Sequence, residues 1–184
     1  MGRDKRFDGR RENVWSFALF WALQAVSIWI IYLPGMLLTH QLLDLKNLYF
    51  RENYAWPFVI VGLSIFLVGF VLEAVADQQK FKFYENHKKA KLQKSRWIDH
   101  GLWSRARHPN YGGEILLWWG LWLVVLPFIP LWQGALAAAG PLWITILLLK
   151  ISGIPLLDKS AREKYGNDPE YQAYRARTRL LFPL

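Results

Sequence analysis

The sequence predicts an all-helical (all-α) integral membrane protein with about four transmembrane helices. Hydrophobic residues make up 53% of the 184 residues and aromatic residues make up 16%, with 11 tryptophans. This composition is more apolar and richer in tryptophan than that of an ordinary soluble domain. The apolar residues are also grouped into stretches that can cross the roughly 30 Å of bilayer hydrocarbon. Because the length corresponds to one domain, we expect a single membrane domain over residues 1–184.

Four apolar stretches are the predicted membrane spans. They are Trp15 to about Leu38, Trp56 to about Leu72, Ile115 to about Leu126 and Leu136 to about Leu149. A kink is expected in the first span at Pro34 and Gly35. Gln24 is the one strongly polar residue of that span, and a lone glutamine in a membrane helix typically hydrogen-bonds another helix. Because Pro127 and Pro130 separate the last two spans, we expect these spans to form a helical hairpin.

The distribution of basic residues predicts the orientation in the membrane. The formal net charge is +9, and Lys plus Arg number 23. Five of them precede the first span, nine lie between Asp77 and Gly112, and seven lie from Lys150 onward, whereas the turn of the predicted hairpin has none. The positive-inside rule therefore places both termini and the central loop in the cytoplasm. Because such cations set topology and contact anionic membrane lipids, we expect no nucleic-acid partner.

Several kinds of chemistry are excluded by the sequence. It contains no cysteine, so disulfides, a thiolate nucleophile and a Cys-ligated metal are ruled out, and we predict no metal site. Neither Gly-x-Gly-x-x-Gly after a strand nor Gly-x-x-x-x-Gly-Lys occurs, so the usual soluble nucleotide-binding loops are missing. The charged lead-in and the long first span do not fit a cleavable signal peptide.

The densest polar cluster, from Gly101 to Glu114, leads directly into the third span. Pro109 suits the first turn of that helix, because the missing N–H costs nothing there. Gly112 and Gly113 would allow close approach by a ligand. Glu114 is an ionisable group at the mouth of a membrane helix, which makes it a candidate functional residue. For the arginines of this cluster, the alternative is that they only mark the cytoplasmic end of a span.

A second polar face is expected where the second span leaves the membrane. Glu73, Asp77 and Lys80 follow a spacing of four and three, so they share one face of a continuing helix. We expect this face to point toward the 101–114 cluster. The alternative is a solvated helix end with a weak surface ion pair. Beyond it, the segment 81–100 is expected to be a basic loop.

The C-terminal part from Ile151 onward is predicted to be an amphipathic tail. Asp168 and Pro169 indicate a turn and a helix start, and the apolar end at 180–184 is expected to rest against the membrane surface. With both termini on one side, the polar residues collect on a cytoplasmic face that can hold the phosphates of a cofactor, since arginine donates to phosphate bidentately. The candidate cofactor-binding residues are Asp77, Lys80, Arg105, Arg107, His108, Asn110, Tyr111, Glu114, Lys150, Asp158, Tyr171 and Tyr174.

Three motifs together resemble the bacterial steroid 5-alpha-reductase-like membrane family of the DUF1295 type. They are the stretch Gly-Leu-Trp-Ser-Arg-Ala-Arg-His-Pro-Asn-Tyr-Gly-Gly-Glu (101–114), the preceding Glu-x-x-x-Asp-x-x-Lys (73–80), and the ending with Asp158, Asp168-Pro-Glu-Tyr and Phe182-Pro183. The resemblance runs from about Asp4 to the C-terminus. The Arg-His-Pro-x-Tyr core alone is less specific, because isoprenylcysteine carboxyl methyltransferases and related membrane methyltransferases have a similar one.

The resemblance implies an NADPH site at the cytoplasmic face and hydride transfer to an activated carbon–carbon double bond of a steroid-like or other lipidic substrate. Asn110 and Glu114 match the cofactor contacts of the family pattern, and Asp77 matches an acidic contact. Arg107, Lys150 and Asp158 correspond less closely. The resemblance also implies a location in the prokaryotic cytoplasmic (inner) membrane.

One departure from the family pattern leaves the function open. Family members usually have further membrane helices before the segment that begins here at Arg3, and in the steroid reductases those helices carry the groups that polarise the substrate carbonyl. We therefore expect either a homo-oligomer or a membrane partner that supplies missing helices, and Tyr111 is a candidate proton donor. The alternatives are a methyltransferase that uses S-adenosylmethionine on a lipid or prenylated substrate, and a non-catalytic membrane scaffold.

Overall fold

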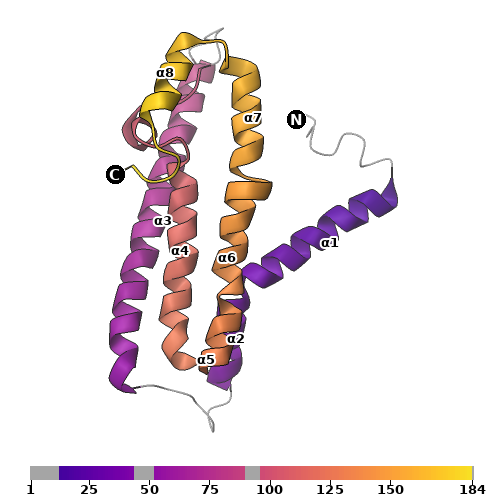
Figure 1. Ribbon diagram of the computed structural model, residues 1–184, viewed down its shortest axis with the longest axis vertical. Helices are drawn as coiled ribbons and strands as arrows, with labels where there is room; N and C mark the ends of the chain where they lie inside the picture. The colour runs from indigo at the N-terminus through magenta and orange to yellow at the C-terminus, as the bar shows by residue number, and fades with distance from the viewer. Residues whose placement is uncertain (1–12, 44–51, 90–95, 184) are drawn as a thin grey trace.

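The computed structural model describes residues 13–43, 52–89 and 96–183, and no β-strand occurs in these ranges. Four helical segments of this part of the chain are long and apolar enough to cross a membrane: Val14–Ile31, Ala55–Lys89, Pro109–Phe128 and Leu131–Tyr165. The predicted all-helical membrane fold is therefore confirmed. Figure 1 shows the last three of these segments side by side in a bundle, with the first leaving the bundle obliquely.

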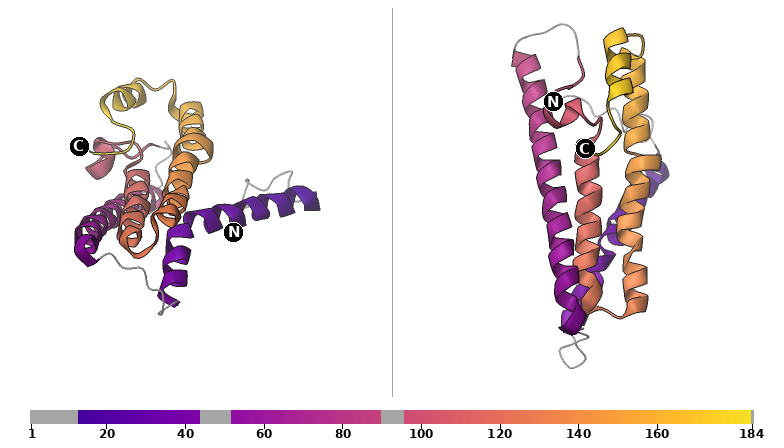
Figure 2. Two further views of the ribbon diagram at one scale, coloured as in Figure 1. Left: turned by 60° about the horizontal axis from the view of Figure 1, so that its bottom comes forward. Right: turned by 60° about the vertical axis from the view of Figure 1, so that its left-hand side comes forward.

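The first predicted span is divided into two helices, α1 (Val14–Ile31) and α2 (Leu33–Leu43). The predicted end of this span at about Leu38 was wrong, because α1 ends at Ile31, and the bend expected at Pro34 is a break between two helices at Tyr32. Pro34 has no N–H to donate, and its ring would clash with the carbonyl of Ile30 in a continuous helix. The chain therefore turns before the proline, and α2 packs into the bundle while α1 points away (Figures 1 and 2).

The second span belongs to α3 (Glu52–Lys89), a 38-residue helix. At 1.5 Å per residue it is about 57 Å long, well beyond the roughly 30 Å of hydrocarbon. Its C-terminal third therefore extends past the membrane core. The predicted loop at 81–100 was wrong for its first half, since α3 continues to Lys89.

Helix α4 (Pro109–Val125) runs antiparallel to α3, and four glycines let the two backbones approach closely. A Cβ at Gly69 would lie 2.6 Å from both the Gly113 oxygen and the Leu117 nitrogen. A Cβ at Gly62 would lie 2.8 Å from the Gly120 oxygen. The two glycines of each helix are seven residues apart, so each pair meets on one seam of the left-handed packing that a seven-residue repeat produces.

The chain returns through a hairpin of short helical pieces. These are a 3-10 turn (Leu126–Phe128), α5 (Leu131–Ala137), α6 (Ala139–Ile146), a π-helical turn (Leu147–Ile151) and α7 (Ile154–Tyr165). The fourth predicted span was thus too short and too regular. Trp122 donates to the Gly134 oxygen (2.9 Å) across the hairpin, and Val125, Ile129 and Ala137 are fully buried there.

The C-terminal segment folds back onto the start of α4. Helix α8 (Pro169–Arg177) begins as predicted, with the Asp168 side chain accepting from the Glu170 N–H at 3.0 Å. Residues 179–180 then pair with residues 105–108 through backbone hydrogen bonds. A Cβ at Gly112 would lie 2.9 Å from the Leu181 oxygen. Protein atoms therefore fill the space that we had predicted for a ligand at Gly112 and Gly113.

Candidate functional site

The predicted polar residues gather at one end of the bundle. The C-terminal half of α3, the segment 96–108, the first turns of α4, and helices α7 and α8 meet there, with α8 lying against the top of the bundle (Figure 1). The 3-10 helix Gly101–Ser104 is fixed to α3 by two hydrogen bonds: Trp103 Nε1 donates to the Ala76 oxygen (3.0 Å), and the Leu102 N–H donates to Gln79 Oε1 (2.9 Å). This anchor positions the loop that leads to His108.

Asn110 links the first turn of α4 to α3. Its Nδ2 donates to Asp77 Oδ1 at 3.0 Å. Glu73 and Glu114 are half-buried, and both lie close enough to Asp77 to interact with it electrostatically. Glu114 is the sixth residue of α4, beyond the first turn where the helix dipole acts strongly. No ion pair joins it to Arg105 or Arg107 in the described residues.

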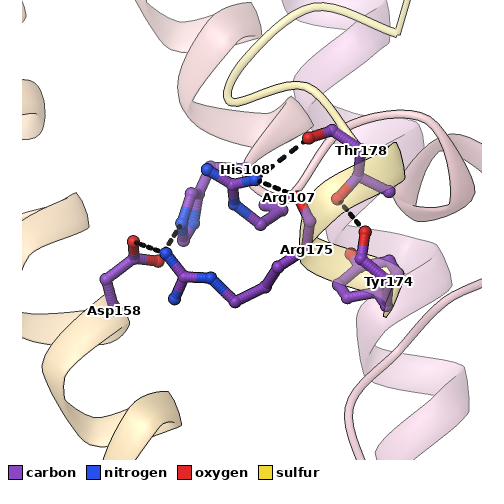
Figure 3. Close-up of polar contacts among 6 residues, drawn as sticks. All are labelled: Arg107, His108, Asp158, Tyr174, Arg175 and Thr178. Atoms are coloured by element: carbon purple, nitrogen blue, oxygen red, sulfur yellow. Dashed lines mark hydrogen bonds and ion pairs between the residues drawn. The ribbon is translucent and has the colours of Figure 1, made fainter. Parts of the chain in front are cut away.

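His108, Asp158 and Arg175 form a connected polar group across three elements (Figure 3). His108 Nε2 lies 3.3 Å from Asp158 Oδ1, and Arg175 Nη2 lies 3.1 Å from Asp158 Oδ2. Burial lowers the pKa of His108, although the hydrogen bond to Asp158 opposes this effect. The neutral ring then carries its proton on Nε2, because a carboxylate only accepts hydrogen bonds. The ring of Tyr111 stacks on His108, with centroids 5.7 Å apart.

Arg107 and Tyr174 mainly hold the C-terminal segment in place. Arg107 Nη1 donates to the carbonyl oxygens of Arg175 and Thr178, each at 2.9 Å, and so satisfies the C-terminal end of α8 (Figure 3). The Tyr174 hydroxyl donates to the Trp103 oxygen at 2.8 Å. Burial raises the pKa of this hydroxyl, so it stays a neutral donor. These contacts tie α8 to the 96–108 segment that leads into α4.

A cavity of about 200 Å³ lies between these elements. Its wall carries three cations, Lys80, Arg107 and Lys164, besides His108 and Asp158. Its aromatic lining consists of Tyr84, Trp97, Trp103, Tyr165, Tyr171 and Tyr174. Three buried side-chain nitrogens at or beside this cavity have no hydrogen-bond partner in the described residues: Trp97 Nε1, Arg107 Nε and Arg175 Nη1. Unpaired buried donors are rare in proteins.

The structure brings together most of the predicted site residues but separates two. Lys80, Arg107, His108, Asp158, Tyr171 and Tyr174 line the cavity. Asp77, Asn110, Tyr111 and Glu114 lie beside it, on α3 and the start of α4. Arg105 is exposed on the loop, and Lys150 is exposed on the π-helical turn. Neither Arg105 nor Lys150 lines the cavity. No metal-binding cluster occurs in the ranges that the structure describes.

Sequence reasoning missed nine of the fifteen residues that line the cavity, and four of the nine are polar or aromatic residues of its wall besides Trp103 and Ser160. Trp97 is the centre of the aromatic cluster and stacks edge-on against Tyr171 at 5.0 Å. Lys164, Tyr165 and Tyr84 also line the wall. The pair Trp97-Ile98 was a usable signal, because two buried apolar residues within a basic segment indicate a packed structure. The contributions of Tyr84 and Lys164 depend on how far α3 and α7 extend, which the hydropathy pattern does not reveal.

Comparisons with known proteins identify the family. The family model described as "Protein of unknown function (DUF1295)" matches residues 1–178. A similar protein is an uncharacterised protein of Schizosaccharomyces pombe, 31% identical over an alignment that covers 72% of this chain and 40% of that protein. The chain thus spans about two fifths of this relative, whose fungal source gives the predicted bacterial origin no support. No solved structure matches the chain. Because the family model covers nearly the whole sequence, this all-helical membrane protein belongs to the DUF1295 family.

Proposed function

We propose that this protein is a membrane reductase that binds NADPH at the cavity between α3, α7 and α8. The observation that carries the proposal is the cavity wall, which combines the cations Lys80, Arg107 and Lys164 with aromatic rings; the unpaired nitrogens Trp97 Nε1 and Arg107 Nε are buried behind this wall. Each donor left without an acceptor costs about 1–3 kcal/mol. A phosphate group offers several charged acceptors at once, and guanidinium and ammonium groups bind it well.

The size of the cavity limits which part of a dinucleotide it can take. About 200 Å³ is less than the roughly 300–1,000 Å³ of sites for drug-sized ligands. The cavity therefore suits a phosphate and its ribose, and the remaining half of NADPH would lie along Asp77, Asn110 and Glu114. Asn110 offers an amide and Glu114 a carboxyl group, which are suitable partners for ribose hydroxyls and a carboxamide.

NADPH would supply a hydride to one carbon of an activated carbon–carbon double bond, and a proton must reach the other carbon. Tyr111 is the candidate donor of that proton, because its ring is held against His108 beside the cavity. A lipidic substrate fits the position of this site, at the point where α3 and α4 leave the apolar part of the bundle. The contact with Asp158 fixes the orientation of the His108 ring, on which the Tyr111 ring stacks.

The proposed cofactor requires that this end of the bundle faces the cytoplasm. Lys80, Arg107 and Lys164 line the cavity, Arg96 contacts α8 and Arg177 belongs to α8, whereas the hairpin at 126–131 has no cation. By the positive-inside rule, this distribution supports a cytoplasmic position of the site and of the C-terminal segment.

A methyltransferase that uses S-adenosylmethionine is the second candidate. The packed rings of Trp97, Tyr171 and Tyr174 favour it, because aromatic faces attract a sulfonium cation. The cations Lys80 and Lys164 in the same wall oppose a positively charged ligand. Titration of the detergent-purified protein with NADPH, NADH and S-adenosylmethionine separates the candidates. Binding of S-adenosylmethionine without binding of NADPH would replace the reductase proposal, and binding of neither would favour a non-catalytic scaffold.

The Glu114→Gln variant tests the cofactor assignment directly. We expect its NADPH affinity to fall roughly ten- to a hundredfold, since a hydrogen bond to a charged group contributes about 1.5–3 kcal/mol. The stability of the ligand-free variant should not fall, because the change removes a carboxylate close to Asp77. Arg105→Ala is the matched control, since Arg105 is an exposed charge of the same segment and should leave the affinity unchanged. Unchanged NADPH affinity in Glu114→Gln would contradict the assignment.

A further inference from the structure

Helix α1 projects away from the bundle in Figure 1 and in the left view of Figure 2. None of its residues is buried, and Trp15, Leu23 and Ile28 are 85%, 59% and 64% exposed. Its C-terminal end contacts the bundle, where the Ile31 oxygen would be 2.7 Å from a Cβ at Gly140. Lipid can cover apolar side chains, so the exposure of these residues alone does not call for a protein partner.

Gln24 differs from the other side chains of α1. It is the only amide in this 18-residue helix and lies near its middle, where a membrane-spanning helix is deepest in hydrocarbon. The side chain is exposed. Its amide has no hydrogen-bond partner in the part of the chain that the structure describes. An amide in hydrocarbon without a partner costs several kcal/mol, so Gln24 needs an acceptor and a donor from outside this chain's described residues.

A second copy of the chain supplies the donor and the acceptor that Gln24 requires, at the same depth in the membrane. Two copies inserted with the same topology are related by an axis along the membrane normal, which places their Gln24 side chains at equal depth. A primary amide carries donors and an acceptor, so two of them satisfy each other across a two-fold axis. We propose that α1 is a self-association helix and that Gln24 hydrogen-bonds Gln24 of a second copy in the membrane.

Cross-linking tests the contact, and the lack of native cysteine makes each introduced thiol unique. Ile28→Cys is compared with Leu23→Cys after oxidation in reconstituted bilayers, and both variants keep the Gln24 amide. Ile28 is 64% exposed and lies one turn from Gln24 on the same face, whereas Leu23 is 59% exposed and is rotated by about 100° from Gln24 around the helix. We expect Ile28→Cys to form covalent dimers much faster than Leu23→Cys. Equal rates for the two positions would overturn the proposal, because random collisions would explain them.

The strength of association tests the amide itself. Fluorescence energy transfer is measured between copies labelled at a cysteine introduced at the exposed Glu163, over a series of protein-to-lipid ratios. Gln24→Leu should weaken association about three- to thirtyfold, as expected for an interhelical hydrogen bond in a membrane, and Leu23→Ala should not. A chain that stays monomeric at all ratios would show that the amide contacts another polypeptide or none. Association of Gln24→Leu that is as strong as in the wild type would show the same. Either result overturns self-association through Gln24.

Discussion

The two ends of the α3–α4 pair are held together by different means. In the apolar part, Gly62 and Gly69 on α3 lie directly against the backbone of α4 at Gly120 and Gly113. At the other end, polar side chains make the connections, from Asn110 to Asp77 and from Trp103 to the Ala76 oxygen. The first region depends on shape alone, and the second depends on hydrogen bonds and charge.

This difference follows from the two environments. Between lipid-exposed helices no hydrophobic force favours association, because lipid tails are as apolar as the side chains. Close packing of small residues is what stabilises the contact there. Outside the hydrocarbon, water can enter, and buried polar groups can be paired and remain available to a ligand. The site therefore lies where the pair changes from shape-based to polar contacts.

The largest expected effect concerns the glycine contacts. Gly69→Leu should destabilise the protein by about 3 kcal/mol or more, since overpacking against backbone cannot relax by side-chain rotation. Thermal unfolding of the purified protein in detergent measures this. Val68→Leu adds bulk at the neighbouring, exposed position of α3 and should have little effect. Similar stabilities for the two variants would show that α3 and α4 are not in close backbone contact at Gly69.

A smaller effect is expected at the polar end. Asp158→Asn removes the charge that accepts from both His108 and Arg175. We expect a loss of about 2 kcal/mol in the free energy of unfolding, because hydrogen bonds to charged groups contribute about 1.5–3 kcal/mol. Lys159→Ala, at the adjacent exposed position of α7, is the control. If chemical denaturation gives the same free energy of unfolding for Asp158→Asn and the wild type, α7 is not anchored through this group.

The smallest effect is a dependence of stability on pH that comes from His108. Burial lowers its pKa in the folded protein, so the unfolded chain binds the proton more readily, with an ordinary pKa of about 6.5. Stability from this group is therefore complete above that value and is lost as the pH falls through it toward the folded pKa. The midpoint of thermal unfolding should decrease from pH 7.5 to 5.5. This decrease should be smaller than the decrease that Asp158→Asn causes at constant pH. His108→Gln should flatten this slope, and an identical slope in the variant would contradict the assignment to His108.

Several elements could be predicted because their signals are local. The spans follow from runs of apolar residues, and the start of α8 follows from Asp168 and Pro169. Other features depend on residues far apart in the sequence. His108 and Asp158 are separated by 50 positions and meet only because α7 returns along the bundle. Hydropathy did not reveal the π-helical turn before α7, which lies within an apolar run.

By itself, the sequence determined that the chain is helical and apolar enough for a membrane, that its cations lie outside the apolar runs, and that Asn110 and Glu114 share one face of a helix. Each of these depends on composition or on spacing within one helix, whereas Asp77 joined them as a match to the family pattern. The tertiary structure alone decided that Gly112 and Gly113 serve packing, that Arg105 and Lys150 lie away from the cavity, and that Trp97 belongs to it. The physical reason is that a side chain's role depends on what packs against it, and packing partners are set by how the helices meet rather than by the order of residues along any one of them.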